Sequence, residues 1–354
     1  MTPGFWNGRR VFLTGHTGFK GSWLSLWLQK LGARVTGFAL PPHTEPSLFE
    51  AADVAGGMTS VIGDIRELAA LREAMLSAAP EIVVHMAAQA IVRESYADPV
   101  GTYATNVMGT VHVLEAMRDL PSVRAAVVVT TDKVYHNEEW AWGYREDDRL
   151  GGRDPYSNSK ACAELVVQAF RASFAAGPDA PAIAAARSGN VIGGGDWATD
   201  RLVRDLVLAF AKNETLVIRH PDATRPWQHV LDPLHGYLVL AERLVEEGNR
   251  YAAAWNFGPG EDGAQTVRTV VERLSKLWGG GRWEIDPGPH AHEAGLLKLD
   301  ISRTRRELGW KPLMDLDTAL DWTVEWYRGF LAGRSHARRA TELQIAQYQE
   351  LAAA

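Results

Sequence analysis

Five polar side chains, grouped in two short segments, are the residues of this sequence best suited to acid–base chemistry. Thr131, Asp132 and Lys133 directly follow an apolar run, and Tyr156 and Lys160 lie further along the chain. Because residues four apart share one face of a helix, the ammonium of Lys160 can lie near the phenol of Tyr156. A positive charge there would lower the pKa of the phenol from about 10, so that Tyr156 could act as a base near neutral pH.

A glycine-rich segment near the N-terminus has the pattern of a phosphate-binding loop. An apolar strand pattern at residues 10–14 runs into Gly15, Gly18 and Gly21, and an amphipathic helix pattern follows. Such a loop lets the backbone approach a diphosphate, and the helix N-terminus favours its negative charge. A glycine-rich turn without a ligand is the alternative. The positive charge of an oxidised nicotinamide would add to that of Lys160. The expected cofactor-binding residues of the loop are Gly15, His16, Thr17, Gly18, Phe19, Lys20 and Gly21.

The residues that would distinguish NAD from NADP are less informative. The second strand pattern ends at residues 37–41 with neither an acidic residue nor an arginine, so local chemistry leaves both cofactors open. Asp64 follows the third strand pattern. Its carboxylate either accepts a hydrogen bond from adenine or caps a helix that begins near Glu67.

The elements that would hold these groups alternate along the first half of the chain. Such alternation predicts an α/β fold, a Rossmann-type doubly wound parallel sheet whose sites lie at the carboxyl ends of the strands. A smaller C-terminal α/β domain is expected to follow. We predict one domain over residues 1–186, to which 234–257 return, and a second over 187–354. Residues 220–228, which contain Pro226, are expected to form a loop. The expected strands of the first domain are 10–14, 34–38, 61–62, 82–86 and 125–130, and its helices 21–31, 68–78, 103–117 and 156–170.

Composition excludes several classes of function. The 354 residues carry 37 Lys and Arg against 43 Asp and Glu, a net charge of −6, which argues against a general nucleic-acid binder. A single cysteine, Cys162, excludes a disulfide framework and indicates a cytoplasmic protein. No signal peptide or membrane span is expected, since the apolar runs are far shorter than about 18 residues. His290 and His292, in a loop rich in proline and glycine, are expected to be solvated, and we predict no metal site.

The chain resembles the extended short-chain dehydrogenase/reductases that act on sugar nucleotides, and within them the 4,6-dehydratases that use CDP-glucose. The segments that discriminate best are 15–23, 130–135 and 139–148. The general resemblance rests on residues 14–21, 85–89, Asn106, 154–160, 187–190 and 308–312.

This resemblance implies NAD as the cofactor, bound in the first domain, and a sugar nucleotide bound mainly in the second. It adds to the expected cofactor-binding residues Ile65, Ala87, Ala88, Gln89, Asn106, Tyr156 and Lys160. It implies Gln89, Asn190, Arg201 and Arg225 as substrate-binding residues. The choice of CDP-glucose rests wholly on the resemblance. A homodimer is also implied, because helices equivalent to 103–117 and 156–170 commonly form a dimer interface in this family.

A dehydratase needs more catalytic groups than an epimerase. After C4 of the sugar is oxidised, loss of water across C5 and C6 requires a base at C5 and an acid at the C6 hydroxyl. Asp132 fits the acid if burial raises its pKa. The dTDP-glucose enzymes carry Asp-Glu at this place, whereas this chain has Asp132 and Lys133, so Lys133 either takes the C5 proton or only orients the substrate. A 4-epimerase, a decarboxylase and a catalytically silent cofactor-binding regulator are the alternative functions.

Overall fold

A parallel sheet with helices on both faces forms the larger part of the protein. The computed structural model describes residues 1–354 except 176, 178–179, 289–293, 334–335 and 354. Within these residues the main sheet is 7-stranded, and each of its strand pairs is parallel. This confirms the predicted α/β, Rossmann-type sheet. In spatial order its strands are β10 (Ala254–Phe257), β6 (Ala182–Ser188), β5 (Ala125–Val129), β4 (Ile82–His85), β1 (Arg10–Thr14), β2 (Arg34–Ala39) and β3 (Thr59–Ile62).

Strand β5 shows why the sheet is covered on both faces. All of its residues are buried, and alternate residues belong to different cores: Ala125, Val127 and Val129 pack on one face, Ala126 and Val128 on the other. A strand buried on both faces reads as a continuous apolar run, as this one does. The carboxyl end of β5 therefore lies between two helical layers.

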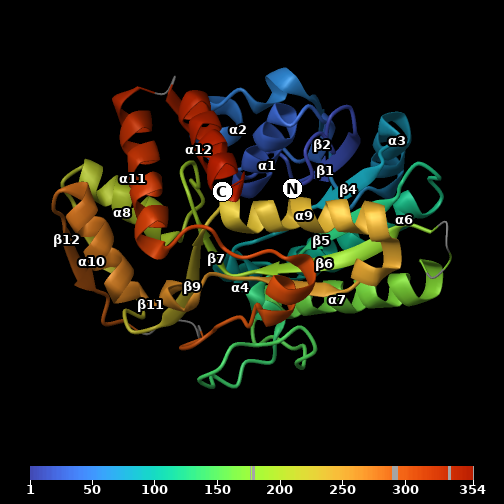
Figure 1. Ribbon diagram of the computed structural model, residues 1–354. Coiled ribbons are helices and arrows are strands. Elements are labelled where there is room, and N and C mark those ends of the chain that lie inside the picture. The colour runs from blue at the N-terminus through green and yellow to red at the C-terminus, as the bar shows by residue number, and fades with distance from the viewer. Residues whose placement is uncertain (176, 178–179, 289–293, 334–335, 354) are drawn as a thin grey trace.

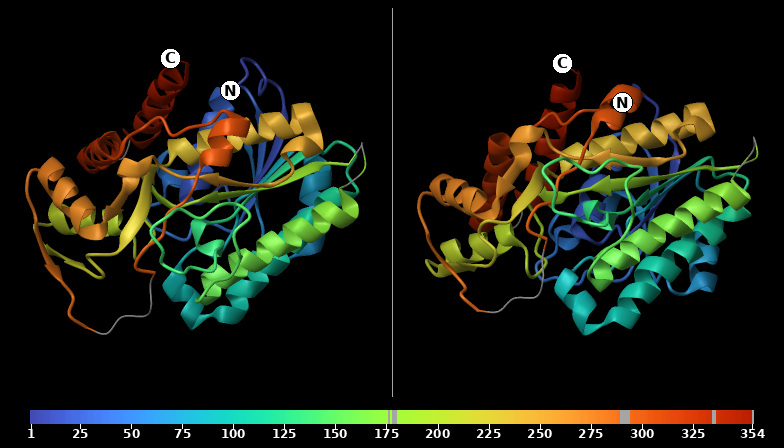
Figure 2. Two further views of the ribbon diagram at one scale, coloured as in Figure 1. Left: turned by 60° about the horizontal axis from the view of Figure 1, so that its bottom comes forward. Right: turned by 90° about the horizontal axis from the view of Figure 1, so that it is seen from below.

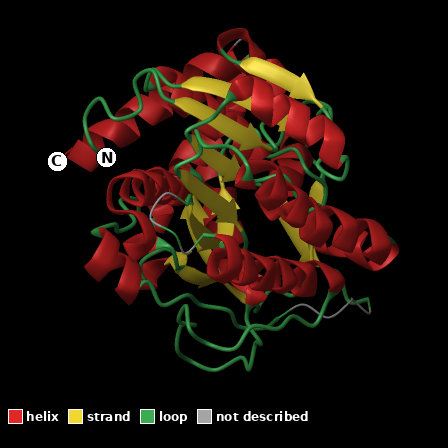
Figure 3. Cartoon of the chain, turned by 90° about the vertical axis from the view of Figure 1, so that its right-hand side faces the viewer, coloured by secondary structure: helices red, strands yellow, loops and turns green. Residues whose placement is uncertain are grey.

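The two helical layers come from different parts of the chain. Helices α3 (Leu68–Ala78), α6 (Gly109–Arg118) and α7 (Pro155–Phe174) cover one face, and α1 (Phe19–Lys30) and α9 (Leu231–Glu247) the other (Figures 1 and 3). The last helix, α12 (His336–Ala353), packs beside α1 and α11 (Leu316–Ala332). The remaining helices are α2 (Leu48–Ala51), α4 (Val92–Ala97), α5 (Pro99–Tyr103), α8 (Leu202–Ala211) and α10 (Val267–Trp278).

A smaller α/β lobe lies beside the carboxyl ends of the main sheet (Figure 2). Its strands form a sheet in the order β11 (Ala264–Thr266), β9 (Thr224–His229), β7 (Asn190–Ile192), and a pair made of β12 (Arg282–Ile285) and β8 (Thr215–Ile218). The expected loop at 220–228 is therefore wrong, because most of it is strand β9. Pro226 is tolerated since β11 pairs with residues 224–226 and β7 with 227–229, so Pro226 has a strand partner on one side only.

The two parts of the chain are interleaved. Strand β10 comes from the C-terminal half and pairs with β6 at the edge of the main sheet, with Ala254 opposite Ala185 and Phe257 opposite Ser188. Helix α9 packs on β5 and β6. The division into domains at residues 186 and 187 stays a prediction. None of the helices in the described part of the chain has both the length and the apolarity that a bilayer span requires.

A buried polar cluster joins α9 to the C-terminal helix. Asp232 is completely buried, and its Oδ1 accepts hydrogen bonds from the Leu313 backbone N–H at 2.8 Å and the Tyr348 hydroxyl at 2.7 Å. Its Oδ2 has no partner among the described residues. Burial raises the pKa of Asp232 to about 6, against the hydrogen bonds, which lower it. The ring of His235 packs edge-on against Tyr348, and burial lowers the pKa of this histidine to about 4.

Candidate active site

The end of β5 and the start of α7 carry the residues expected to be catalytic. Asp132, Lys133 and Val134 form a short 3-10 turn, and the Thr131 hydroxyl caps it by accepting from the Lys133 N–H. Helix α7 begins at Pro155, with the Asp154 carboxylate accepting from Ser157 N–H. Proline at the first position and aspartate at the cap are typical of a helix start, so the sequence itself fixes where α7 begins.

Asp132 is buried beside Thr131. The carboxyl is 2 % exposed, and its Oδ1 accepts from the Thr131 hydroxyl at 3.0 Å. Its Oδ2 has no partner among the described residues and faces Gly189, where a β-carbon would lie 3.2 Å away. Burial raises the pKa of Asp132, while Lys133 and Arg225 lower it. A carboxyl in such a place can hold a proton and deliver it.

Tyr156 and Lys160 are both buried. The protein groups raise the pKa of the Tyr156 phenol instead of lowering it as expected. Burial raises the pKa of Tyr156 to about 12, although a hydrogen bond with Thr131 and the charge of Arg201 lower it. Lys160 Nζ donates to the carbonyl of Val129 at 3.1 Å. Burial and the charge of Lys20 lower the pKa of Lys160 to about 8. Tyr156 and Asp132 both lie beside Thr131, whereas Lys160 is bonded to the strand just before it.

The glycine loop between β1 and α1 fits a diphosphate. Gly15 has a φ of +80°, and a β-carbon there would lie 2.7 Å from the backbone nitrogen of Ala87. A β-carbon on Gly21 would collide with the carbonyl oxygen of Gly15. Helix α1 starts at Phe19 with Gly18 as its cap, and no side chain of the described residues caps it. Its first N–H groups therefore point at the position that an anion would take.

Two side chains of this loop turn away from that position. The ring of His16 is buried, packs over Gly37 at the end of β2, and hydrogen-bonds Ser60 at 2.8 Å. Lys20 Nζ donates to the hydroxyls of Ser188 and Tyr237, each at 3.1 Å. Burial lowers the pKa of Lys20 to about 8. Thr17 donates to Leu40 O, so it fastens the loop to the end of β2.

The remaining cofactor residues border the same edge of the sheet. Asp64 pairs with Arg66 through the Arg66 N–H and guanidinium, so it is not the helix cap that was the alternative reading. Ile65 is buried against Gly109, and Ala87 lies against Gly15. Ala88 is half-buried in the loop after β4. These residues follow β3 and β4, at the carboxyl edge of the sheet, where ligands of such sheets bind.

A buried hydrogen-bond network, which the sequence analysis missed, links the loop to α7. Thr14 and Thr110 lie on either side of the His85 ring, at 2.7 Å and 3.1 Å. Thr110 donates to Asn106 O, and Asn106 Nδ2 donates to Ser159 Oγ in α7. Burial lowers the pKa of His85 to about 3, so the ring is neutral. His85 belongs to the segment 85–89 on which the resemblance rests, and that was the available signal.

Gln89 and Asn106 brace the loop that follows β4. Asn106 Oδ1 accepts from the Gln89 N–H at 2.9 Å, and Asn106 Nδ2 also donates to Gln89 O at 3.0 Å. The Gln89 side chain is bonded to both polar backbone groups of Ile91 and to Thr102. Its amide is therefore used within its own part of the fold, and a role for Gln89 in ligand binding stays a prediction.

The expected substrate residues come from the smaller lobe. Asn190 begins β7 and is half-buried. Arg225 is 4 % exposed in β9, and its charge reaches Asp132, whose pKa it lowers. Arg201 stands at the start of α8, with Nε 3.7 Å from Asp196 Oδ2, and its charge lowers the pKa of Tyr156. Two arginines thus approach the catalytic groups from outside the main sheet, an arrangement suited to a diphosphate.

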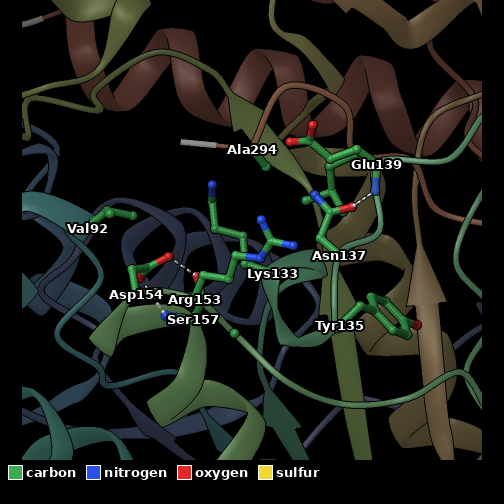
Figure 4. A pocket seen from close by; sticks show the side chains of 11 residues that line it. Val92, Lys133, Tyr135, Asn137, Glu139, Arg153, Asp154, Ser157 and Ala294 are labelled. Carbon is green, nitrogen blue, oxygen red and sulfur yellow. Dashed lines mark hydrogen bonds between the residues drawn. The ribbon is translucent and has the colours of Figure 1, made fainter. Parts of the chain in front are cut away.

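Lys133 lines a pocket beside the start of α7 (Figure 4). Its cavity volume is about 40 Å³. Lys133 and Arg153 place two cationic side chains in it, and Glu139 and Asp154 two carboxylates. The other lining residues are Val92, Tyr135, Asn137, Gly152, Ser157, Ala294 and Leu297.

No group of at least three potential ligands able to hold a metal ion occurs among the residues that the structure describes. His290 and His292 lie outside those residues.

Comparisons with known proteins place the chain in one family. It matches the family described as GDP-mannose 4,6 dehydratase over residues 12–323. It is 51% identical over 334 residues to the CDP-glucose 4,6-dehydratase of Salmonella typhimurium, a match that covers 93% of each chain. It is 30% identical to a dTDP-glucose 4,6-dehydratase of Streptomyces griseus, over 69% of this chain and 71% of the relative. The solved structure of DesIV, a dTDP-glucose 4,6-dehydratase of Streptomyces venezuelae with NAD bound, has a TM-score of 0.75 at 26% identity and covers 90% of this chain and 97% of its own.

Proposed function

The chain belongs to the GDP-mannose 4,6 dehydratase family of the extended short-chain dehydrogenase/reductases, and on that premise we propose that it converts CDP-glucose to CDP-4-dehydro-6-deoxyglucose and water, with NAD as a cofactor that is regenerated in each cycle. The observation that carries this proposal is the buried carboxyl of Asp132 beside Tyr156. An epimerase only removes and returns hydrogen at C4 and has no use for an acid at that place, whereas a dehydratase needs one.

The residues that would hold NAD are those of the glycine loop and the edge of the sheet next to it. The backbone approach of Gly15 to Ala87 and of Gly21 to Gly15, with the uncapped start of α1, supports this assignment. NAD, when bound, would supply the acceptor for the hydride of C4 and its donor to C6, and a positive charge in its oxidised form. That charge would add to that of Arg201, against the burial that raises the pKa of Tyr156 to about 12.

Three side chains then move the protons. Tyr156 takes the proton of the C4 hydroxyl as C4 is oxidised. Lys133 takes the C5 proton, and Asp132 gives its proton to the departing C6 hydroxyl, which leaves as water. Lys133 returns the proton to C5 as C6 is reduced. The sugar is neither oxidised nor reduced overall.

The proton count assigns Thr131 a part in closing the cycle. At the end of one turnover Tyr156 holds a proton that it lacked at the start, and Asp132 lacks the one it gave away. The next turnover therefore requires a transfer from the phenol to the carboxyl. The Thr131 hydroxyl donates to Asp132 Oδ1 and also lowers the pKa of Tyr156, and all three side chains are buried, which supports a transfer through this hydroxyl.

Two measurements test the proposed function. The purified protein with NAD is incubated with CDP-glucose, and the alkali-induced absorbance of a 4-keto sugar is followed. In Asp132→Asn, substrate should still reduce the cofactor, because Tyr156 and Lys160 are untouched, while water loss should stop. A 4-epimerase would form no 4-keto product, and a silent regulator would reduce no cofactor. Dehydration at the native rate in Asp132→Asn would remove Asp132 from the mechanism.

We also propose that the protein is a homodimer. Helix α5, the π-helical stretch Ala104–Met108 that follows it, and α7 expose apolar side chains that a second copy would cover: Val100 is 78% exposed, Leu165 53% and Met108 48%. Sedimentation velocity tests this, and a Leu165→Glu variant should shift the protein toward the monomer. A cytoplasmic location and the absence of nucleic-acid partners stay predictions from the single Cys162 and the net charge of −6.

A further inference from the structure

The short turn that carries the catalytic residues is held at both of its ends by the same buried ion pair. Thr130, just before the turn, donates from Oγ1 to Glu164 Oε1 at 2.6 Å. Tyr135, just after the turn, accepts from Arg187 Nη1 at its hydroxyl at 2.8 Å. Glu164 and Arg187 are each 1% exposed and are joined by two hydrogen bonds of 2.8 Å. The turn that carries Asp132 and Lys133 is thus attached at both ends to the Glu164–Arg187 ion pair.

The Glu164–Arg187 ion pair connects α7, β6 and β10. Glu164 lies on α7, one helical turn beyond Lys160, and Arg187 lies on β6, beside β5 in the main sheet. Arg187 also donates to the carbonyl of Glu146, and the Tyr135 hydroxyl donates to Asn256 Oδ1 at 2.7 Å on β10. A bidentate arginine–carboxylate pair has a defined geometry, so a group bonded to it has little freedom to move.

The catalytic groups depend on the distance between β5 and α7. Asp132 comes from the strand and Tyr156 and Lys160 from the helix. Lys160 Nζ reaches Val129 O at 3.1 Å, directly before Thr130. Among the described residues, the Thr130 hydroxyl adds a second side-chain bond between the end of β5 and α7; its other contact, with Ala186 O, is 3.5 Å long. A lateral shift of the strand end would change the spacing of Asp132 and Tyr156.

We propose that Thr130 is a positioning residue, whose hydroxyl ties the catalytic turn to the Glu164–Arg187 pair and thereby sets the spacing between the Asp132 carboxyl and the Tyr156 phenol. Thr130 is 5 % exposed and precedes the groups that react, so it acts through them and not on the substrate. The consequence for turnover rests on the proposed dehydratase function, whereas the consequence for geometry does not.

The test uses Thr130→Val, which has nearly the same shape and lacks the hydroxyl. Variants of the ion pair itself are less suitable, because each would leave a buried charge without its partner. In Thr130→Val, Glu164 Oε1 keeps Arg187 Nε at 2.8 Å, so no buried acceptor loses its last donor. Thr130→Ser restores the hydroxyl. Thr323→Val is the matched control, since the buried Thr323 hydroxyl on α11 donates to Ala319 O at 2.7 Å outside the site.

The kinetic outcome is read on the NAD-loaded enzyme with CDP-glucose. We expect Thr130→Val to lower kcat about 10- to 100-fold, because a misplacement near 1 Å costs that much, with KM unchanged. Thr130→Ser should return kcat to within about threefold of the native value, since it restores the hydrogen bond. Thr323→Val should keep the native kcat. A native kcat in Thr130→Val, or no recovery in Thr130→Ser, overturns the proposal.

A crystal structure of Thr130→Val gives an outcome that does not depend on any substrate. The proposal expects the turn of Thr131 to Val134 to move relative to α7 by more than about 0.5 Å, the tolerance within which catalytic groups must be held. A turn superimposable on the native one overturns the proposal, whatever the activity. Failure of the native enzyme to act on CDP-glucose would instead count against the proposed function alone. Tyr135→Phe, which removes the bond at the other end, provides a second variant should Thr130→Val not fold.

Discussion

Replacing Asp232 by asparagine should stabilise the protein above neutral pH. The folded protein buries this carboxylate completely, leaves its Oδ2 without a partner among the described residues, and raises its pKa from 3.8 to about 6. Because the folded-state pKa lies above the ordinary value, folding favours the protonated form. The buried charge therefore lowers the free energy of unfolding. This loss is absent below about pH 4 and fully present above about pH 6.

The size of the effect follows from the pKa. At about 1.36 kcal/mol for each pKa unit, a carboxyl moved from 3.8 to about 6 loses about 3 kcal/mol of stability when charged. Asparagine removes the charge and keeps an oxygen for Leu313 N–H and the Tyr348 hydroxyl. Its amino group takes the place of the unpartnered Oδ2 and stays without an acceptor, which costs about 1 to 2 kcal/mol. The expected net gain is about 1 to 2 kcal/mol, or about 1 to 3 °C in the Tm of a chain of this length.

Thermal unfolding, followed by circular dichroism, measures this gain at about pH 5 and about pH 8. We expect a higher Tm for Asp232→Asn at the upper pH and little or no gain at the lower pH, where only about half of the charge cost is present and the unpaired amide of asparagine offsets it. The exposed Asp321 on α11, changed to asparagine, controls for the substitution itself. A gain of equal size at both pH values, or a variant less stable than the native protein at pH 8, would refute the reasoning.

Three further effects follow from the site. Glu164→Gln should lower the free energy of unfolding by about 3 to 5 kcal/mol in a denaturant titration, because it leaves the Arg187 charge buried alone, and an unchanged midpoint would contradict this. Gly21→Ala should weaken NAD binding at least about tenfold in a fluorescence titration, since its β-carbon would collide with Gly15 O; native affinity would show that the loop tolerates it. The pKa of Lys160 is lowered to about 8, so its positive charge is present below that pH and lost above it; kcat should fall as pH rises through about 8, and a flat profile to pH 10 would exclude a role for the charge.

The alternation of strands and helices, and hence a parallel sheet with its ligand edge at the carboxyl ends, was predictable because local pattern and global fold agree in the first half of the chain. Strand β5 is apolar throughout, and the polar Thr131 follows where a parallel sheet exposes its ligand edge. The start of α7 was predictable from Asp154 and Pro155, which have the chemistry of a cap and a first turn. These patterns depend only on residues close together in the sequence, and tertiary packing does not override them.

The features that sequence missed depend on partners far along the chain. Nothing near Lys20 indicates that its amino group meets Tyr237, which is 217 positions away. The same holds for Glu164 and Arg187, whose pairing needs α7 and β6 to be packed first. Strand β9 was missed because Pro226 is a local argument against a strand, and only the short neighbours β7 and β11 make it acceptable.

The place of β10 at the edge of the main sheet has a consequence for synthesis on the ribosome. When Ser188 has left the exit tunnel, β6 is complete, but its partner at 254–257 has not yet been translated. At about 5 to 20 residues per second, the nascent chain carries an unpaired edge for several seconds. An open strand edge is a template for aggregation, so premature termination in this interval would release a fragment that is prone to aggregate. We therefore expect the nascent chain to need chaperones most while the residues between β6 and β10 are being translated.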